Sequence, residues 1–97
     1  MKVIGSPLGL EKLEETAKFI ASDKPSAANK WVNDIFDMTE NLGLQAEIGR
    51  KVPELMSAKY RELIFGHYRI IYKIDNDIQI LTVRNSRQFL TIESIEP

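Results

Sequence analysis

The spacing of apolar residues changes from a helical to a strand period near residue 60, and this change restricts the possible folds more than any other feature of the chain. Between residues 10 and 42, apolar residues recur every three or four positions, which is the period of an amphipathic helix. From Leu63 onward, runs rich in β-branched and aromatic residues are separated by short polar turns, a pattern typical of hairpin-linked strands. Helices followed by strands predict an α+β fold.

Two helices are expected in the N-terminal half. The second begins near Pro25, because proline interrupts a preceding helix and is favoured in a first helical turn. Each helix is amphipathic, so the two should form an antiparallel hairpin that packs on the sheet. The expected apolar faces consist of Leu10, Leu13, Ala17 and Ile20 in the first helix and of Trp31, Ile35, Met38 and Leu42 in the second.

The strands should form a small antiparallel sheet. Gly66-His67 and Asp75 to Asp77 predict tight turns between consecutive strands, so three strands form a meander with the helices on one face. The expected strands span residues 63–65, 68–74 and 78–83, with Lys2–Gly5 as a further strand at the edge, while residues 91–97 are expected to be a loosely held tail.

Length and composition exclude several classes of protein. The 97 residues are enough for one domain, expected to span residues 1–97. The chain has no cysteine and a single histidine, which excludes disulfide scaffolds and multi-histidine or thiolate metal centres within one chain. No cofactor or metal is expected. The longest apolar runs are only a few residues and no signal pattern precedes them, so we expect a cytoplasmic protein without membrane contact.

Charge is divided unevenly along the chain. The net charge is −1, but residues 1–49 carry five lysines against eight acids, and residues 50–97 carry eight bases against six acids. Every arginine lies in the second half. Guanidinium groups bind carboxylate or phosphate in a bidentate manner, so these residues are the first candidates for a binding site.

Alternation along the strand at residues 68–74 places Arg69 and Lys73 on the face away from the helices. Together with Arg61 and with Arg84 or Arg87, they would form an anion-binding groove on an open sheet face. Its ligand would be RNA phosphate or the carboxylates of an acidic partner. The simpler alternative is a sheet face with cations that only increase solubility.

Candidates for acid–base chemistry are weak. His67 lies in a predicted turn without a partner, and such histidines are usually exposed to solvent. Glu54 and Glu62 lie among arginines, so we interpret them as ion-pair partners rather than general bases.

Several segments together resemble the RelE/ParE superfamily of type II toxin–antitoxin toxins. The resemblance covers most of the chain and is strongest in the strand region. It is carried by Ser6-Pro7, Asp23 to Ala28, Gly49 to Leu55, Tyr60 to Ile74 and Ile80 to Arg87. The family fold is a helix hairpin on a small antiparallel sheet.

This resemblance implies a growth-inhibiting toxin, of the kind linked to plasmid stabilization, that a cognate antitoxin neutralises in a hetero-oligomer. RelE-like members are ribosome-dependent mRNA endoribonucleases, whereas ParE-like members inhibit DNA gyrase without established catalytic residues. In a RelE-like protein the resemblance assigns catalysis to Arg61, Arg69 and Arg87. The candidate antitoxin- or target-binding residues are Arg50, Arg61, Arg69, Lys73, Arg84 and Arg87.

Departures from the RelE-like pattern favour gyrase as the target. Asn85 occupies a position where many relatives have histidine, Gln88 replaces a basic residue, and no tyrosine or histidine follows Arg87. A net charge of −1 is also unfavourable for entry into ribosomal RNA. A third possibility is an inert module that retains only antitoxin binding.

Overall fold

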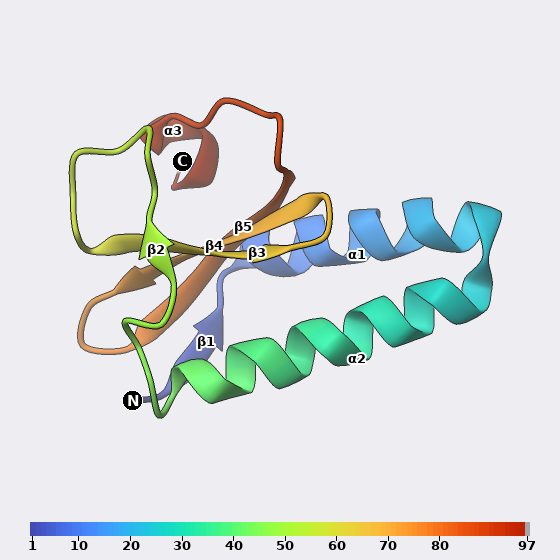
Figure 1. Cartoon of the computed structure of the whole chain (residues 1–97), viewed down its shortest axis with the longest axis horizontal. Coiled ribbons are helices and arrows are strands. Elements are labelled where there is room, and N and C mark those ends of the chain that lie inside the picture. The colour runs from blue at the N-terminus through green and yellow to red at the C-terminus, as the bar shows by residue number, and fades with distance from the viewer. Residues whose placement is uncertain (97) are drawn as a thin grey trace.

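The computed structural model describes residues 1–96 as a helix hairpin on one face of a five-stranded sheet (Figure 1). The strand order is β1-β5-β4-β3-β2, with β1 parallel to β5 and every other pair antiparallel. No helix within these residues is long and apolar enough to cross a membrane. The elements are β1 (Val3–Gly5), α1 (Pro7–Asp23), α2 (Pro25–Leu42), β2 (Arg50–Lys51), β3 (Tyr60–Phe65), β4 (Tyr68–Ile74), β5 (Ile78–Asn85) and α3 (Ile92–Ile95).

Local sequence signals explain where α1 and α2 begin. The Ser6 hydroxyl caps α1 by accepting a hydrogen bond from the Gly9 N–H at 2.9 Å, and Pro7 occupies the first turn, where no backbone donor is needed. Pro25 occupies the first turn of α2 in the same way. The predicted antiparallel helix hairpin is confirmed (Figure 1).

The helices bury one face of the sheet. Trp31 and Ile35 of α2 pack with Ile70 and Val83 of the central strands, and the Trp31 ring meets the ring of Tyr68 edge-on at a centroid distance of 5.5 Å. Such edge-to-face contacts are favourable for aromatic pairs. Met38 is only half-buried, and Leu10 is 55% exposed, so Leu10 does not belong to the core as its spacing predicted.

The expected strands are present, and β3 and β5 extend further than predicted. Because β1 runs parallel to β5, the sheet is mixed and not wholly antiparallel as expected. β3 begins at Tyr60 and β5 continues to Asn85, while residues 50–51 of the connector add a short edge strand, β2. A β-bulge shifts the pairing of β4 with β5 next to Ile71. The turn at Gly66-His67 is confirmed, and Gly66 has a φ of 59°, a left-handed conformation that glycine adopts at low cost.

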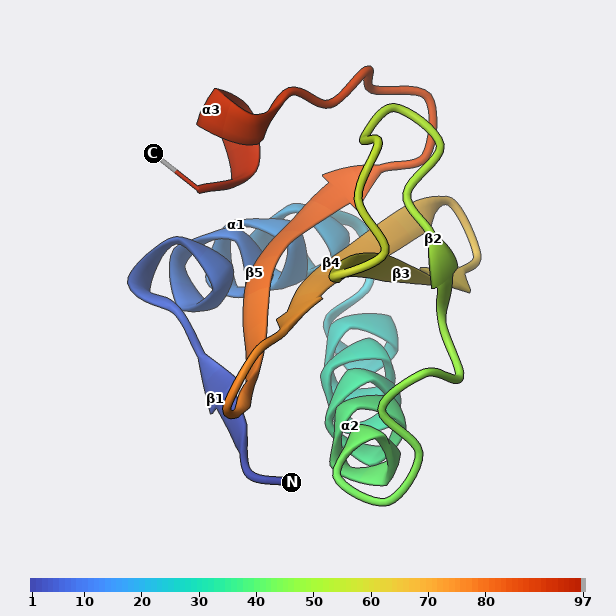
Figure 2. The ribbon, with the colours of Figure 1, turned by 90° about the vertical axis from the view of Figure 1, so that its left-hand side faces the viewer.

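The second face of the sheet is covered, which corrects the expectation of an open face and a loosely held tail. The chain beyond β5 folds back over this face and forms α3 (Figure 2). Leu90 and Ile95 are each 1% exposed and pack with Val52, Tyr60 and Ile71. Burying these two large aliphatic side chains favours the position of the segment against the sheet. Pro97, the last residue of the predicted tail, lies outside the described residues.

Candidate functional site

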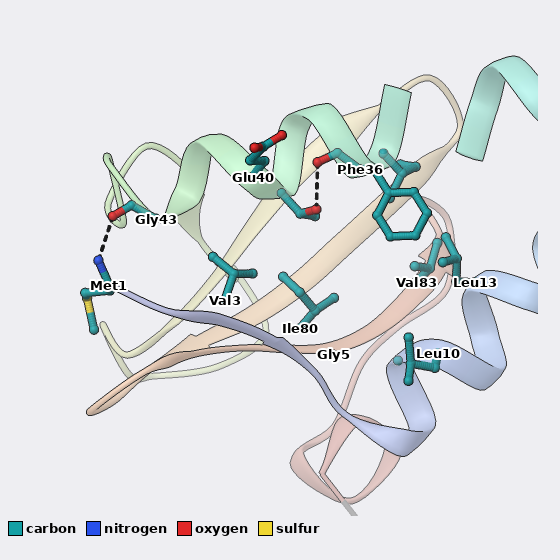
Figure 3. A pocket seen from close by; sticks show the side chains of 13 residues that line it. Met1, Val3, Gly5, Leu10, Leu13, Phe36, Glu40, Gly43, Ile80 and Val83 are labelled. Carbon is teal, nitrogen blue, oxygen red and sulfur yellow. Dashed lines mark hydrogen bonds between the residues drawn. The ribbon is translucent and has the colours of Figure 1, made fainter. Parts of the chain in front are cut away.

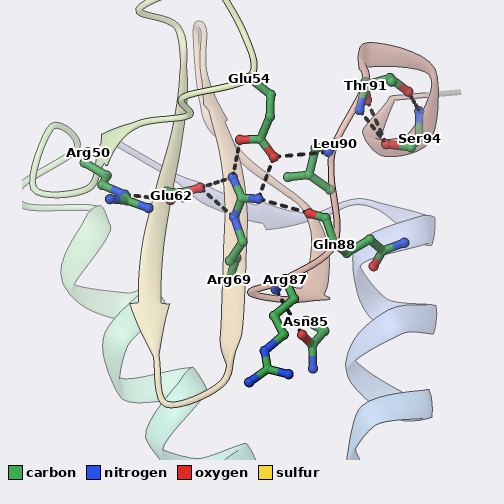
Figure 4. Close-up of polar contacts among 10 residues, drawn as sticks. All are labelled: Arg50, Glu54, Glu62, Arg69, Asn85, Arg87, Gln88, Leu90, Thr91 and Ser94. Atoms are coloured by element: carbon green, nitrogen blue, oxygen red, sulfur yellow. Dashed lines mark hydrogen bonds and ion pairs between the residues drawn. The ribbon is translucent and has the colours of Figure 1, made fainter.

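The most concentrated charge in the described chain surrounds Arg69 on β4 (Figure 4). Its Nε and Nη2 donate to Glu62 Oε1 at 2.8 and 2.5 Å, and its Nη1 and Nη2 donate to the two Glu54 oxygens at 2.7 and 2.8 Å. Nη1 also reaches the Gln88 carbonyl at 3.2 Å. Arg69 is 4% exposed. The guanidinium is therefore bound on all its donor edges by the chain itself.

Elements distant in sequence bring these groups together. Glu62 faces the same side of the sheet as Arg69 from the neighbouring strand β3, and Glu54 projects from the connector between β2 and β3. Arg50 completes the cluster, because its Nε donates to Glu62 Oε2 at 2.7 Å while its side chain is 62% exposed. The expectation that Glu54 and Glu62 are ion-pair partners is confirmed.

Electrostatics favour the charged forms of Glu54 and Arg69. The guanidinium of Arg69 lowers the pKa of Glu54 from 4.5 to about 2, and the backbone N–H of Leu90 contributes in the same direction. Hydrogen bonds from Arg69 to Glu54, followed by those to Glu62, raise the pKa of Arg69 in turn. A carboxylate with so low a pKa is a poor general base near neutral pH.

Arg61 lies on the opposite face, which corrects its predicted convergence with Arg69. In the register of β3 with β4, Arg61 pairs with Tyr72, and directly paired residues project to the same face of a sheet. Tyr72 is buried against the helices. The Arg61 Nη1 accordingly donates to the backbone carbonyls of Gly49 at 3.0 Å and Glu47 at 3.4 Å.

The remaining predicted cations do not form an open groove either. Lys73 pairs with the Glu96 carboxylate, and the Arg84 Nη2 donates to the Ser94 carbonyl at 2.5 Å. Arg87 is exposed at the end of β5, and its backbone N–H donates to the Asn85 side chain at 3.0 Å. Arg69, Lys73 and Arg84 do share one face, but residues 88–96 cover that face and contact each of these cations.

A second feature is an apolar groove between the two helices, with a volume of about 490 Å³ (Figure 3). Ile80 and Val83 of β5 lie among its lining residues, and β1 runs along one end. Leu10 of α1 and Phe36 of α2 contribute large apolar surfaces that are 55% and 56% exposed. The groove is lined by Met1, Val3, Gly5, Gly9, Leu10, Leu13, Ile35, Phe36, Thr39, Glu40, Gly43, Ile80 and Val83.

The edge strand β1 borders this groove. Within the described residues β1 pairs only with β5, so its outer edge retains unpaired backbone groups that can receive another chain. The Met1 ammonium group donates to the Gly43 carbonyl at 2.7 Å and joins the start of β1 to the end of α2.

Reasoning from the sequence missed this groove. It assigned Leu10 to the buried stripe of the first helix, and it gave no role to Phe36, which immediately follows Ile35 of the second stripe. A phenylalanine outside the buried stripe indicates an exposed apolar surface. That this surface borders a groove depends on how the two helices pack, which the sequence does not show.

Comparison with known proteins yields one family and similar solved structures. The sequence model of the family described as ParE toxin of type II toxin–antitoxin system, parDE, matches residues 3–89. No curated protein matches the chain. Among the solved structures, a chain of the chromosomal ParDE TA system from P. aeruginosa is similar, with a TM-score of 0.71 and 20% identity over 88% of this chain and 95% of that chain.

Proposed function

Because the chain belongs to the ParE toxin family of type II toxin–antitoxin systems, we propose that it stops growth by binding DNA gyrase and not by cutting mRNA. The protein is the toxin component of such a module, and a cognate antitoxin is its implied partner. Gyrase as the target is the part that we propose.

The state of Arg69 carries this proposal. Cleavage of RNA needs cations directed at the developing phosphate charge and a group that transfers a proton. Arg69 is buried and bound by Glu54 and Glu62, and Arg61 faces away from it. The one histidine of the chain, His67, is exposed in a turn. This arrangement supports a protein that acts by binding.

Two assays in parallel test the target. Purified toxin is added to DNA gyrase in a supercoiling reaction and, separately, to a cell-free translation reaction in which mRNA ends are mapped by primer extension. We expect loss of supercoiling and intact mRNA. Cleaved mRNA with normal supercoiling would replace our proposal by a RelE-like endoribonuclease, and no effect in either assay would indicate an inert antitoxin-binding module.

For the antitoxin, we propose that an apolar segment of it occupies the groove between α1 and α2, forming a hetero-oligomer. Exposed Leu10 and Phe36 supply large apolar surface beside the groove, and exposed apolar surface of this kind marks sites of protein interaction. The free edge of β1 offers backbone hydrogen bonds to an extended stretch of the same segment. Of the cations predicted to bind the antitoxin, Arg69 is buried and Lys73 is paired with Glu96, so the groove is the site that we favour.

Matched substitutions test the groove. Phe36→Ser removes an aromatic side chain that lines it, whereas Phe19→Ser removes one from α1 that is 64% exposed and does not line it. We expect Phe36→Ser to weaken antitoxin binding at least about 30-fold, as for an interface hot spot of about 2 kcal/mol. Phe19→Ser should leave affinity within about twofold, measured by calorimetry. Equal effects of the two changes would exclude the groove as the main antitoxin site.

A further inference from the structure

The sheet face opposite the helices is covered by the connector and by the end of the chain, and the second covering lies largely beyond the part of the chain that the family model matches. The family match ends at residue 89, whereas the covering segment, residues 88–96, contains α3 and both of its buried anchors, Leu90 and Ile95. We call this stretch the C-terminal segment. It lies on the side of the sheet away from α1 and α2 (Figure 2), where Leu90 and Ile95 pack with residues of β4 and β5.

The C-terminal segment supplies the carboxylate that pairs with Lys73 of the sheet. The Glu96 carboxylate pairs with Lys73 and accepts a hydrogen bond from the Tyr60 hydroxyl at 2.6 Å. The Lys73 side chain is only 12% exposed, and within residues 1–96 no other carboxylate pairs with it or with Arg84. Lys73 and Tyr60 thus form a carboxylate site that Glu96 occupies.

The segment itself has little that holds it independently. α3 is four residues long, far shorter than a helix that is stable alone. The segment also carries two exposed apolar residues, Phe89 at 76% exposure and Ile92 at 41%. Contact with the sheet therefore rests on two aliphatic anchors and a few polar contacts, a combination typical of segments that open locally.

We propose that the face beneath the C-terminal segment is a second recognition surface, separate from the helix groove, and that the segment is its exchangeable intramolecular occupant. The external ligand is an acidic, aliphatic peptide segment of a partner. The chemistry of this ligand follows from what the surface already binds. Leu90 and Ile95 pack on apolar residues of the sheet, and the carboxylate next to Ile95 lies between Lys73 and Tyr60. This inference does not depend on whether gyrase is the target.

The test uses the full chain with the segment released. Ile95→Ser combined with Glu96→Gln removes one anchor and the carboxylate, and a fluorescein-labelled peptide of residues 88–96 serves as the probe in an anisotropy titration. We expect the released variant to bind the peptide at least about tenfold more tightly than the natural chain, whose own segment competes. A peptide carrying Glu96→Gln should bind several-fold more weakly, because it lacks the charge-assisted contacts.

Glu93→Gln is the matched control, since Glu93 is an exposed carboxylate on the same short helix without an ion pair among the described residues. It should bind the peptide as the natural chain does. A folded released variant with no gain in peptide affinity would overturn the proposal. So would a released variant that prefers a labelled RNA oligonucleotide to the peptide, because the cations would then serve phosphate.

If the released variant does not fold, hydrogen exchange on the natural chain decides. The amides of Leu90 and Glu96 donate to Glu54 and to the Ile92 carbonyl. Exchange of these amides at least about tenfold faster than that of the β4 amides, and insensitive to low denaturant, would support an exchangeable occupant. Exchange only through global unfolding would show a permanent part of the core and reject the proposal.

Discussion

At the scale of single residues, Arg69 decides what this sheet face can do. Its side chain pairs with Glu54 and Glu62, both removed from most solvent, and it leaves no donor edge for a ligand. A buried charge is tolerated when it is paired and hydrogen-bonded, but removing one partner strands the other. Arg69 is therefore a structural residue in the described state of the protein.

Arg69→Ala should destabilise the protein by about 3–5 kcal/mol, because Glu54 and Glu62 lose their shared cation inside the protein. Urea unfolding at neutral pH measures this loss. Arg87→Ala, at an exposed arginine, is the control and should change stability by no more than about 0.5 kcal/mol. Similar small losses in both variants would contradict the structural role of Arg69.

Because of Tyr60, we expect the free energy of unfolding to fall at alkaline pH. The hydrogen bond to Glu96, together with burial, raises the pKa of Tyr60 from 10.0 to about 12. Because the folded pKa lies above the unfolded one, the stabilisation is complete below pH 10 and is lost as the pH rises toward 12. Urea unfolding at increasing pH should show this loss in the natural chain and less of it in Tyr60→Phe. Equal pH dependence in both would exclude Tyr60 as its source.

At the scale of elements, the position of α1 depends on how closely its first turn approaches β5. The Ser6 hydroxyl caps the helix and also donates to the Leu81 carbonyl at 3.1 Å, and the Ser6 N–H donates to the Ile80 carbonyl at 2.9 Å. Gly9 is buried at this contact. The angle of α1, and with it the width of the helix groove, is therefore set by backbone contact with the strand.

Gly9→Ala should be destabilising although alanine favours helices. A Cβ at this position would lie 2.5 Å from the Ile80 carbonyl oxygen, so the helix must move away from β5. Overpacking of this kind costs about 1–3 kcal/mol, more than the gain of about 1 kcal/mol in helix propensity. Thermal unfolding measures the net loss, with exposed Glu11→Ala as a control on the same helix. A stabilised Gly9→Ala variant would contradict this close approach.

At the scale of the whole molecule, the sheet is a middle layer between two coverings of different chemistry. The helices cover one face with apolar side chains, while the connector and the C-terminal segment cover the other with a mixture of aliphatic anchors and ion pairs. Those ion pairs join segments that are distant in sequence. Protonating their carboxylates should therefore weaken the contact of the connector and the C-terminal segment with the sheet.

Acid should remove the stabilisation provided by Glu54. Its folded pKa of about 2 lies below the ordinary value of 4.5, so its contribution is present above pH 4.5 and is lost as the pH falls toward 2. The separation of these pKa values corresponds to roughly 3 kcal/mol. Urea unfolding over this range should show a smaller pH dependence in Glu54→Gln, and an unchanged pH dependence would exclude Glu54 as its main source.

The sequence by itself determined the main helices and strands and some of the ion pairs. Periodicity located both helices and the three long strands, Pro25 marked the start of α2, and Gly66 marked a turn. The interpretation of Glu54 and Glu62 as partners of arginines was also right. These features depend on neighbours along the chain or on simple charge complementarity, which the order of residues records directly.

Only the tertiary structure decided which surfaces are open. The register of β3 places Arg61 on the face that the helices cover. The C-terminal segment covers Arg69 and Lys73 on the other face. The packing of α1 and α2 leaves Leu10 and Phe36 beside a groove. The physical reason is that register, covering and helix angle arise from packing between segments far apart in sequence. A local period fixes which residues share a face of an element, but not what lies against that face.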